Sequence, residues 1–565
     1  MLGRVLRQLA ARFHRPAAAS PDAGVLDQCK AACSARPNDY ALHVNWSNLL
    51  KQSGHVAGAR ALLERAVQVE PARYEAWYNL GILLFETWWL DESIDAFERA
   101  LQGFPPGSDD ARLQSVVLST ALALQRAGEW KKATQFLEHW AAELPAMASD
   151  CRRVALLGSV VDPDASPAAS LAAHRAWAQV HADPKAPARP GYTNIPAAQR
   201  PLRVGYVSGD LCSHAVSLFF EPVLACHDRG AFELFCYDNS PREDSTTVRL
   251  RRHRAVWRAI AGIADDECRR LIQADRIDVL VDLSGHTAHN RLDLFALKPA
   301  PVQVTWLGYR TTTGMAAMDW RVTDGVVDPP GASDGWYSER LMRLSCSQWC
   351  FAEPESSVEP GLLPMLASGH VTFGSFNQFD KLNERAIRIW ARILSALPAS
   401  RLVIAGVPLG SRRAKFLGLW QRHGIQAGRL ELHSYVSRAE FHALHRRVDV
   451  ALDTFPCNGG TTTCESLWMG VPVVTLAGQW GIARAGSSLL HAARLADWVA
   501  DNESAYAEIA IERARDVDAL ARLRASLRAQ LRGSPLMDGA RFTRALEDGV
   551  RAAWREWCDR ASFVS

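Results

Sequence analysis

The chain has 565 residues, and since one domain usually has about 100–200 residues, a single-module protein is excluded and roughly three or four folding units are expected. Apolar residues make up 48% and charged residues 22%, a balance typical of a globular protein and too hydrophobic for a disordered chain. The 64 Lys and Arg against 61 Asp and Glu leave a formal charge of +3. This weak charge argues against nucleic acid as a partner.

The cysteines and the hydropathy pattern indicate where the protein works. Twelve cysteines form no Cys-x-x-Cys pair, so we expect reduced thiols and no zinc or dithiol site. No apolar stretch approaches the ~18–20 residues that cross a bilayer, and residues 1–20 lack the apolar core of a secretory signal. We therefore expect a cytoplasmic protein without a membrane partner. Residues 1–35 are treated as an N-terminal segment whose Arg-rich start is frayed, with a weak amphipathic surface helix as the alternative.

Residues 36–150 contain an internal repeat. Glu, Arg, Ala and Pro recur 34 positions apart in LLERAVQVEP (62–71) and AFERALQGFP (96–105), and a third copy with a six-residue insertion ends at Pro145. Thirty-four residues is the period of tetratricopeptide (TPR) repeats, so we predict a short all-α solenoid. Such arrays commonly hold a peptide or partner protein on their concave face. The alternative is that these helices only brace the next domain.

The rest of the chain predicts two α/β lobes. Residues 151–200 are rich in Ala and Pro and are predicted to be a linker with one helix inside it. Short apolar segments then alternate with helical ones, which is typical of doubly wound parallel sheets. A polar stretch separates a first lobe, 201–365, from a second, 366–565, which ends in helices. The expected strands are 202–209, 232–238, 277–283, 302–306, 371–376, 401–406, 429–435, 448–453 and 471–476.

Two segments of the second lobe predict a phosphate site. In LDTFPCNGGTTTCESLWMGVP (452–472) a strand is followed by two glycines, three threonines and a helix that we expect to begin at about Glu465. A helix N-terminus offers unpaired N–H groups and partial positive charge, which suits a diphosphate, although capping without a ligand is the alternative. FGSFNQFDK (373–381) places Gln378 and Lys381 after another strand, where an ammonium group would stabilise a departing phosphate. Neither a dinucleotide fingerprint nor a P-loop is present.

Histidines follow two strands of the first lobe. His214 lies in VSGDLCSHAVSLFFEP, and Asp282 and His286 lie in VDLSGHTAHN. Imidazole is well suited to accept a proton near neutral pH, although a single loop histidine is more often structural. The histidine pairs at helical spacing, His286/His289 and His442/His445, have no accompanying carboxylate or cysteine that could complete a metal site. No metal site is therefore predicted.

These features together resemble bacterial members of the O-linked N-acetylglucosamine transferase family, which is related to plant O-fucosyltransferases and bacterial protein N-glucosyltransferases. The resemblance rests on the repeats and on RVGYVSGDLCSH, VDLSGH, APVQVTWLGYRTTTG, FNQFDK and LDTFPCNGGTTTCESLWMGVPVVTL, in collinear order over about residues 40–550. It implies an inverting glycosyltransferase of the GT-B fold, with two Rossmann-like domains. It also implies a nucleotide-sugar donor held mainly by the second lobe, a protein acceptor, and no metal or other cofactor.

The resemblance assigns roles to individual positions. His214 occupies the place of a histidine that acts as base or acceptor-site residue, and the donor's own phosphate is the alternative proton acceptor. Asp282 and His286 are possible supporting residues. The remaining positions are Gln378, Lys381, Thr461 and Thr462 for the donor phosphates, Glu465 for the ribose, Val436 and Arg438 for the base, and Thr287, Leu307 and Gly308 for the sugar pocket.

Three positions depart from the family pattern. Arg310 in LGYRTTTG stands where relatives usually have proline beside the sugar pocket, Gly460 replaces a histidine of animal members, and Leu211 stands where Phe is common. Arg310 leaves the identity of the sugar open. We expect transfer of N-acetylglucosamine from UDP-N-acetylglucosamine to Ser or Thr hydroxyls of proteins. The alternatives are O-fucosyl transfer, N-glucosyl transfer, and a non-catalytic protein that binds nucleotide sugars.

Overall fold

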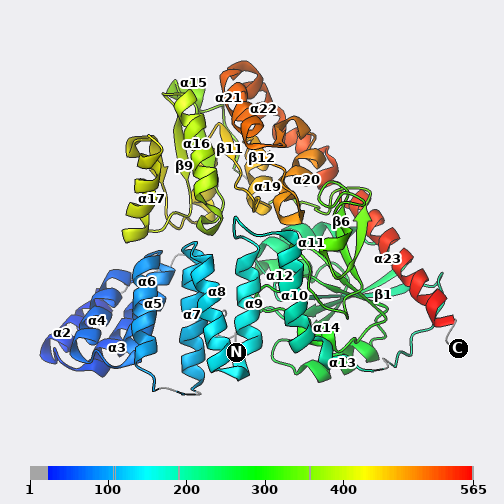
Figure 1. Cartoon of the computed structure of the whole chain (residues 1–565), viewed down its shortest axis with the longest axis horizontal. Helices are drawn as coiled ribbons and strands as arrows, with labels where there is room; N and C mark the ends of the chain where they lie inside the picture. Colours follow the sequence, from blue (N-terminus) through cyan, green and yellow to red (C-terminus); the bar gives the residue numbers. More distant parts are fainter. Residues whose placement is uncertain (1–22, 106, 109, 189–190, 355–357, 563–565) are drawn as a thin grey trace. The chain divides into compact units, whose positions relative to one another are not determined.

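The computed structural model describes residues 23–105, 107–108, 110–188, 191–354 and 358–562. Two compact units are present: residues up to 158 together with 406–419, and residues 159–405 together with 420–565. Figure 1 gives the element labels used below. The predicted frayed start of the chain, residues 1–20, lies outside the described residues.

The first unit is helical, and consecutive helices pack in pairs as the repeats predict. Close packing within one pair depends on Gly81, because a Cβ atom there would lie 2.5 Å from the ring of Phe97 on the next helix. The predicted solenoid is therefore confirmed. Its helices are α2 (Ala23–Ala35), α3 (Tyr40–Gln52), α4 (Val56–Val69), α5 (Tyr74–Glu86), α6 (Leu90–Gln102), α7 (Ala111–Arg126), α8 (Trp130–Glu143) and α9 (Ala148–Ser159).

The first unit also contains an ion-pair cluster that we call the acidic clasp, formed by Asp91, Glu129, Arg412 and Lys415. Arg412 at the start of α17 (Gly410–Arg422) lies 2.7 Å from an oxygen of Asp91 and 2.8 Å from one of Glu129. Lys415 lies 2.7 Å from the other oxygen of Asp91. These groups hold the pKa of Asp91 below its usual value, although burial opposes them.

The second unit contains two sheets whose strands are all parallel. The first sheet has the order β3-β2-β1-β4-β5-β6-β7, so the strand order reverses beside β1. Such a reversal leaves a crevice at the carboxyl ends of the strands. The strands are β1 (Leu202–Ser208), β2 (Phe232–Asp238), β3 (Val256–Ala259), β4 (Val279–Asp282), β5 (Val302–Thr305), β6 (Trp320–Asp324) and β7 (Arg340–Leu344).

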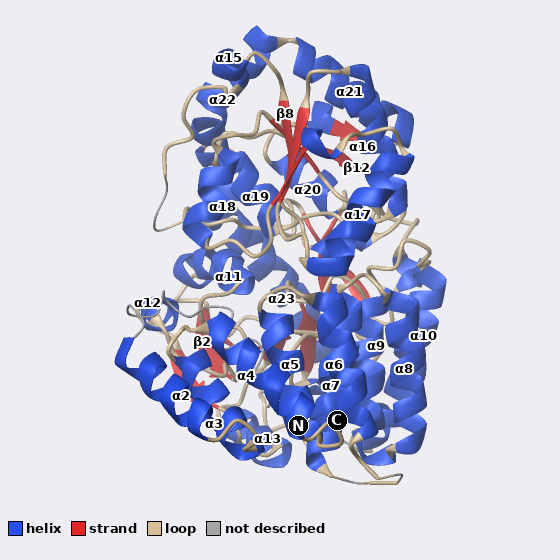
Figure 2. Cartoon of the chain, turned by 90° about the vertical axis from the view of Figure 1, so that its left-hand side faces the viewer, coloured by secondary structure: helices blue, strands red, loops and turns tan. Residues whose placement is uncertain are grey.

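The second sheet has the order β10-β9-β8-β11-β12-β13, which reverses beside β8. Helices cover both of its faces, with α16 and α21 on one side of β8 and β12 and α19 and α22 on the other (Figure 2). The predicted two-lobed α/β fold is confirmed. The strands are β8 (Thr372–Ser375), β9 (Arg401–Ile404), β10 (Leu430–Leu432), β11 (Val450–Leu452), β12 (Val473–Leu476) and β13 (Val499–Ala500).

Helices of the second unit connect these strands, and the last one returns to the first sheet. Phe542 on α23 stacks on Trp306 at 5.6 Å, and Glu547 lies 2.8 Å from the ring of His227. On α22, Arg528 Nε donates to Trp468 O of α19 at 2.8 Å, so the predicted helical tail packs on both lobes. The helices are α10 (Pro167–His181), α11 (Ala215–Cys226), α12 (Ser245–Leu250), α13 (Asp265–Ala274), α14 (Leu292–Ala296), α15 (Met365–Ser368), α16 (Glu384–Ala396), α18 (Arg438–His445), α19 (Thr461–Trp468), α20 (Ala485–Ala492), α21 (Glu503–Arg515), α22 (Val517–Arg532) and α23 (Gly539–Ser562).

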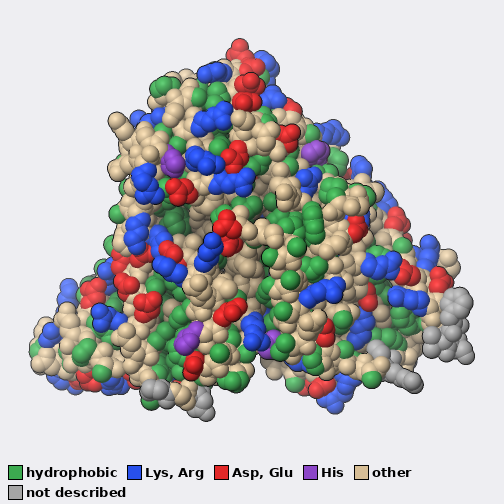
Figure 3. All heavy atoms as spheres, in the orientation of Figure 1, with side chains coloured by type: hydrophobic (Ala, Val, Ile, Leu, Met, Phe, Trp, Pro, Cys, Tyr) green, Lys and Arg blue, Asp and Glu red, His purple; other side chains and the backbone are tan. Residues whose placement is uncertain are grey.

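The surface charges and the state of the cysteines agree with what the composition predicts. Basic and acidic side chains are interspersed on the face shown in Figure 3. None of the twelve cysteines forms a disulfide, and nine of them are buried. Among the described residues, no helix has the length and apolar character that a membrane span requires.

Candidate active site

The predicted phosphate-binding residues of the second lobe follow the carboxyl ends of the neighbouring strands β8 and β11. Asp453 anchors the loop after β11, because one carboxylate oxygen accepts hydrogen bonds from Gly459 N at 2.7 Å and Asn377 Nδ2 at 3.1 Å. The other oxygen accepts from Thr475 Oγ1 at 2.7 Å. Burial raises the pKa of Asp453, and these hydrogen bonds oppose that shift.

The phosphate loop leads into α19, which begins at Thr461 and not at Glu465, so the predicted start of this helix was wrong. Gly460 is the N-cap, and its carbonyl accepts from Cys464 N at 3.1 Å. First-turn N–H groups have no intrahelical acceptor, and Gly460 brings no side chain to cap them. Thr461 and Thr462 thus lie in the first turn, where Thr462 Oγ1 donates to Asn377 Oδ1 at 3.1 Å.

Lys381 reaches the same loop from the other strand. It ends the short helix η4 (Phe379–Lys381), and its ammonium group donates to the carbonyl oxygen of Asn458 at 3.0 Å. Burial lowers the pKa of Lys381 below its usual value. Gln378, at the N-cap of η4, is exposed. The structure therefore brings Gln378, Lys381, Thr461 and Thr462 to one edge of the sheet.

The residues expected to hold the ribose and base come together on α18 and α19. Arg438, the first residue of α18, is half-exposed and lies 3.5 Å from a carboxylate oxygen of Glu465. The ring of His442 lies 3.8 Å from the same oxygen. Val436 stands two residues before this helix and is partly buried. Behind them His445 stacks on Phe376 at 3.8 Å, and burial lowers the pKa of His445 to about 3.

In the first lobe, His214 is the N-cap of α11, after the carboxyl end of β1. Its Nδ1 accepts a hydrogen bond from Val216 N at 3.3 Å and lies 3.6 Å from an oxygen of Asp210. Burial raises the pKa of Asp210. The His214 side chain is 46% exposed, so one edge of the ring is open to a substrate.

Asp282 and His286 have structural roles in the interior. Both oxygens of Asp282 accept hydrogen bonds, from Ser284 N at 3.0 Å and from Thr305 Oγ1 at 2.8 Å among others, and burial raises its pKa to about 6. His286 Nε2 lies 2.9 Å from the carbonyl oxygen of Thr313, and the ring is 2% exposed. Both side chains hold loops in place at the carboxyl end of β4.

The expected sugar-pocket residues lie where the loops after β4 and β5 meet. A Cβ atom at Gly308 would lie 2.1 Å from the carbonyl oxygen of Leu283, so this position requires glycine. Leu307 adopts the left-handed backbone conformation, with φ of 74°. Thr287 Oγ1 donates to Ser284 O at 2.7 Å. Thr287, Leu307 and Gly308 are thus adjacent parts of one wall.

Sequence reasoning missed Asn377, Asp453 and Asn458 as organisers of this site. All three lie inside or beside the segments that predicted phosphate binding, so their position at strand ends was the available signal. Arg310 was identified only as a departure from the family pattern. In the structure its guanidinium donates to the carbonyl oxygen of Asn458 at 2.9 Å, across the two lobes.

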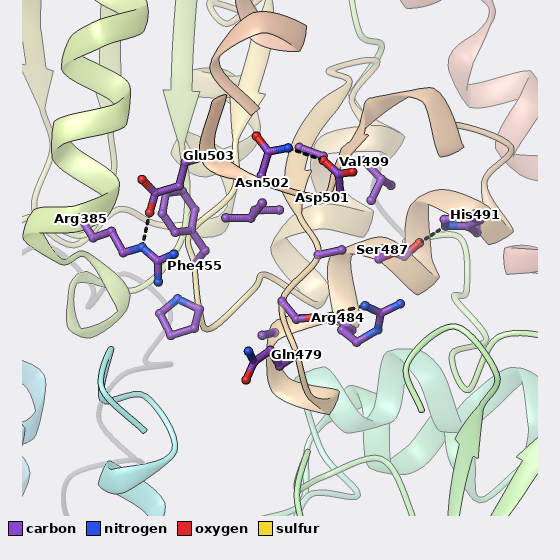
Figure 4. Close-up of a pocket in the computed structure, with 16 residues that line it drawn as sticks. Arg385, Phe455, Gln479, Arg484, Ser487, His491, Val499, Asp501, Asn502 and Glu503 are labelled. Atoms are coloured by element: carbon purple, nitrogen blue, oxygen red, sulfur yellow. Dashed lines mark hydrogen bonds and ion pairs between the residues drawn. The ribbon is translucent and has the colours of Figure 1, made fainter. Parts of the chain in front are cut away.

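A second pocket, with a volume of about 930 Å³, opens at the carboxyl ends of β12 and β13 (Figure 4). Its charged side chains are already engaged: Arg385 pairs with Glu503, and Arg484 donates to Gly478 O at 3.0 Å. It shares Phe455 with the loop that leads to α19. No group of three or more His, Cys, Asp or Glu suited to a metal ion occurs among the described residues.

Comparison with known proteins agrees with this geometry. The model of Glycosyl transferase family 41 matches residues 179–350 and 363–546, which form the two lobes. The chain belongs to this family. A tetratricopeptide repeat model matches residues 44–108.

The relatives of this family 41 chain include plant and bacterial proteins. The tomato (Solanum lycopersicum) protein named probable UDP-N-acetylglucosamine--peptide N-acetylglucosaminyltransferase SPINDLY is 42% identical over 66% of this chain and 41% of its own length. The Arabidopsis thaliana protein named probable UDP-N-acetylglucosamine--peptide N-acetylglucosaminyltransferase SEC is 30% identical over 63% of this chain and 37% of its own length. The chain thus spans about two fifths of these curated relatives. A mutant O-GlcNAc transferase of Thermobaculum terrenum matches with a TM-score of 0.81 and 37% identity, over 92% of this chain and 98% of that one.

Proposed function

We propose that the chain is an inverting glycosyltransferase that moves a sugar from a nucleotide sugar, UDP-N-acetylglucosamine in the first instance, to Ser or Thr hydroxyls of proteins. The names of its relatives support a protein acceptor and this donor. The observation that carries the proposal is the convergence of Lys381 and the uncapped start of α19 on the loop after β11.

The reaction needs stabilisation of a leaving group. The acceptor oxygen forms a bond to the anomeric carbon while the bond from that carbon to the diphosphate oxygen breaks, and the bonding pair leaves with the nucleoside diphosphate. The Lys381 ammonium, the Thr461 and Thr462 hydroxyls and the first-turn N–H groups of α19 would face this developing charge. Preorganised donors of this kind typically contribute on the order of 10²–10³ in rate each.

His214 would position the acceptor from the first lobe. Because its Nδ1 accepts the Val216 N–H, the neutral ring carries its proton on Nε2 and can donate to the incoming hydroxyl oxygen. We assign this positioning role to His214 and the proton acceptance to the donor phosphate. His214→Gln retains a side-chain N–H donor and should keep more activity than His214→Ala, with the same pH profile as the wild type. A pH profile that loses its acidic limb in both variants would assign the base to His214 instead.

The decisive experiment is Lys381→Ala. We expect donor turnover to fall by about 10²–10³, with circular dichroism and melting temperature close to wild type. Lys30→Ala is the matched control, since the Lys30 side chain is 67% exposed on α2 and removes the same charge elsewhere. Unchanged turnover in Lys381→Ala would refute the assignment of this site.

The donor, the acceptor and the location can be tested separately. A donor that binds the folded chain raises its melting temperature by mass action, so a panel of UDP- and GDP-sugars identifies the nucleotide and sugar. We propose that the helical repeats engage the acceptor protein, as solenoids commonly do, and that nucleic acid and membranes are not partners. Twelve cysteines without a disulfide favour a cytoplasmic location, which cell fractionation would test.

A further inference from the structure

Two cationic side chains from different lobes share one acceptor. Arg310 Nη1 donates to the carbonyl oxygen of Asn458 at 2.9 Å, and Lys381 Nζ donates to the same oxygen at 3.0 Å. Arg310 follows β5 in the first lobe, whereas Lys381 follows β8 in the second. Asn458 lies between them, two residues before the N-cap of α19. The guanidinium therefore reaches the loop to which the phosphate site was assigned.

The backbone on either side of Arg310 is fixed. Arg321 Nη1 donates to the carbonyl oxygens of Tyr309 at 3.0 Å and Thr311 at 2.8 Å, which flank Arg310 directly. One residue further, the buried Glu339 carboxylate accepts from Thr312 Oγ1 at 2.7 Å. This frame fixes the backbone at Arg310, so ligand binding does not have to order that segment of the chain.

Placing two cations on one neutral carbonyl is electrostatically unfavourable. Like charges a few ångströms apart repel by about 1 kcal/mol in water and by several times more in a partly buried site. The charges of Asp380 and Asp453 attract Lys381 and offset part of this repulsion. The oxygens of Asp453, however, already accept hydrogen bonds from Gly459, Asn377 and Thr475. A polyanion beside both cations would turn this repulsion into attraction, and arginine matches phosphate oxygens with paired N–H groups.

We infer that Arg310 is a second cation for the donor's diphosphate, supplied by the first lobe and acting together with Lys381. The inference rests on the proposed function for the class of ligand, a nucleoside diphosphate or its sugar. It gives a reason for the departure at this position, since the proline usual in relatives has no group that could reach Asn458. It also makes donor binding a property of both lobes.

The test uses the full chain and measures the affinity of UDP and of GDP by calorimetry. A hydrogen bond to a charged group corresponds to about 10- to 100-fold in affinity. Arg310→Ala should therefore lower the affinity for the nucleotide that the wild type binds by that factor. Arg310→Gln can still donate to the Asn458 carbonyl but has no charge, and should be weakened to a similar extent. Arg310→Lys should recover part of the loss.

Arg484→Gln is the matched control. Arg484 also connects the lobes, since its Nε donates to Val326 O at 2.8 Å. Its other hydrogen bond, from Nη1, goes to Gly478 O at 3.0 Å and not to the phosphate loop. The nucleotide affinity of Arg484→Gln should stay within about twofold of that of the wild type. If Arg310→Gln binds the nucleotide as well as wild type while Arg310→Ala does not, Arg310 only positions Asn458 through its hydrogen bond. The inference is then overturned.

The outcomes separate this inference from the proposed function. Diphosphate binding that weakens in Arg310→Ala and Arg310→Gln, without sugar transfer by the wild type, supports the inference and refutes the proposed function. Sugar transfer with affinity unchanged in both variants refutes the inference alone. A wild-type chain that binds neither UDP nor GDP refutes both.

Discussion

Asp453 accepts a 2.7 Å hydrogen bond from the backbone N–H of Gly459, six residues further along the same loop. This bond folds the loop back on itself, and it places Asn458 where Lys381 and Arg310 can both donate to its carbonyl oxygen. One buried carboxylate therefore determines the shape of the segment that precedes α19.

Asp453→Asn should loosen this loop without removing its shape entirely. The amide oxygen can keep the Gly459 contact and the amide nitrogen can face Thr475, but the charge assistance is lost, at a cost of about 1–2 kcal/mol. We expect the free energy of unfolding to fall by that amount and the donor KM to rise about tenfold. Thr475→Val, which removes only the contact on the other carboxylate oxygen, should affect KM less. An unchanged KM in Asp453→Asn would contradict the role given to this loop.

Gly308→Ala tests the wall of the expected sugar pocket. The new methyl group would lie 2.1 Å from the carbonyl oxygen of Leu283, so the loops after β4 and β5 must separate. Overpacking of this kind typically costs about 1–3 kcal/mol, and we expect lower unfolding free energy together with a loss of turnover. Gly325→Ala is the control, because its added Cβ would meet no atom within 4 Å. Equal stability of the two variants would show that the loops are not held together at Gly308.

The parts of the fold that follow local patterns were predictable from the sequence. The 34-residue repeat defined the helix pairs, and apolar segments located nine of the thirteen strands that the described part of the chain contains. Strands β6 and β7 were missed because arginines interrupt their apolar pattern. Among these arginines, Arg321 of β6 is 2% exposed and donates hydrogen bonds to the carbonyls that flank Arg310.

The candidate site was predictable only where it depends on strand ends. Glycine and threonine are weak helix formers, so the sequence placed the start of α19 at Glu465, whereas the turn closed by Asp453 and Gly459 lets it begin at Thr461. The contact from Arg310 to Asn458 spans 148 residues and two lobes. No local periodicity encodes such a contact, and it required the folded chain.

His174 on α10 should make stability depend on pH. Its Nδ1 donates to Ser170 O at 2.6 Å, so Nε2 accepts from the Tyr309 hydroxyl at 2.8 Å, and burial lowers its pKa to about 4. Because the unfolded histidine titrates near 6.5, the unfolded state binds more protons between pH 4 and 6.5, and stability falls as pH decreases through this window. From pH 7 to 5 we expect a loss of about 2 kcal/mol from this residue.

The comparison that isolates His174 is urea unfolding of wild type and His174→Gln at pH 7 and pH 5. Other buried histidines, such as His445, titrate in both proteins and cancel in the difference. The variant should lose about 2 kcal/mol less than wild type over this range. Equal losses in the two proteins would mean that His174 is protonated in the folded state.

The acidic clasp also makes the stability of the first unit fall in acid, but here the cause is the protonation of a carboxylate in the folded state. The cations of Arg412 and Lys415 keep the pKa of Asp91 low, so this carboxylate contributes stability above its unfolded pKa of about 4, and the contribution is lost as pH falls through the lower folded value. Asp91→Asn should remove it at all pH values, at a cost of about 1–3 kcal/mol.

Hydrogen exchange within residues 410–419 measures that cost locally, in the segment that the clasp holds. We expect faster exchange there in Asp91→Asn than in wild type at pH 7, and convergence of the two only as pH falls through the lowered pKa of Asp91. Glu98→Gln on the same helix α6 is the control, because Glu98 is exposed and lies outside the clasp. If residues 410–419 exchange equally fast in Asp91→Asn and Glu98→Gln, the clasp does not hold this segment. The start of α17 is then fixed by the backbone hydrogen bond from Leu409 N to Trp88 O at 2.7 Å.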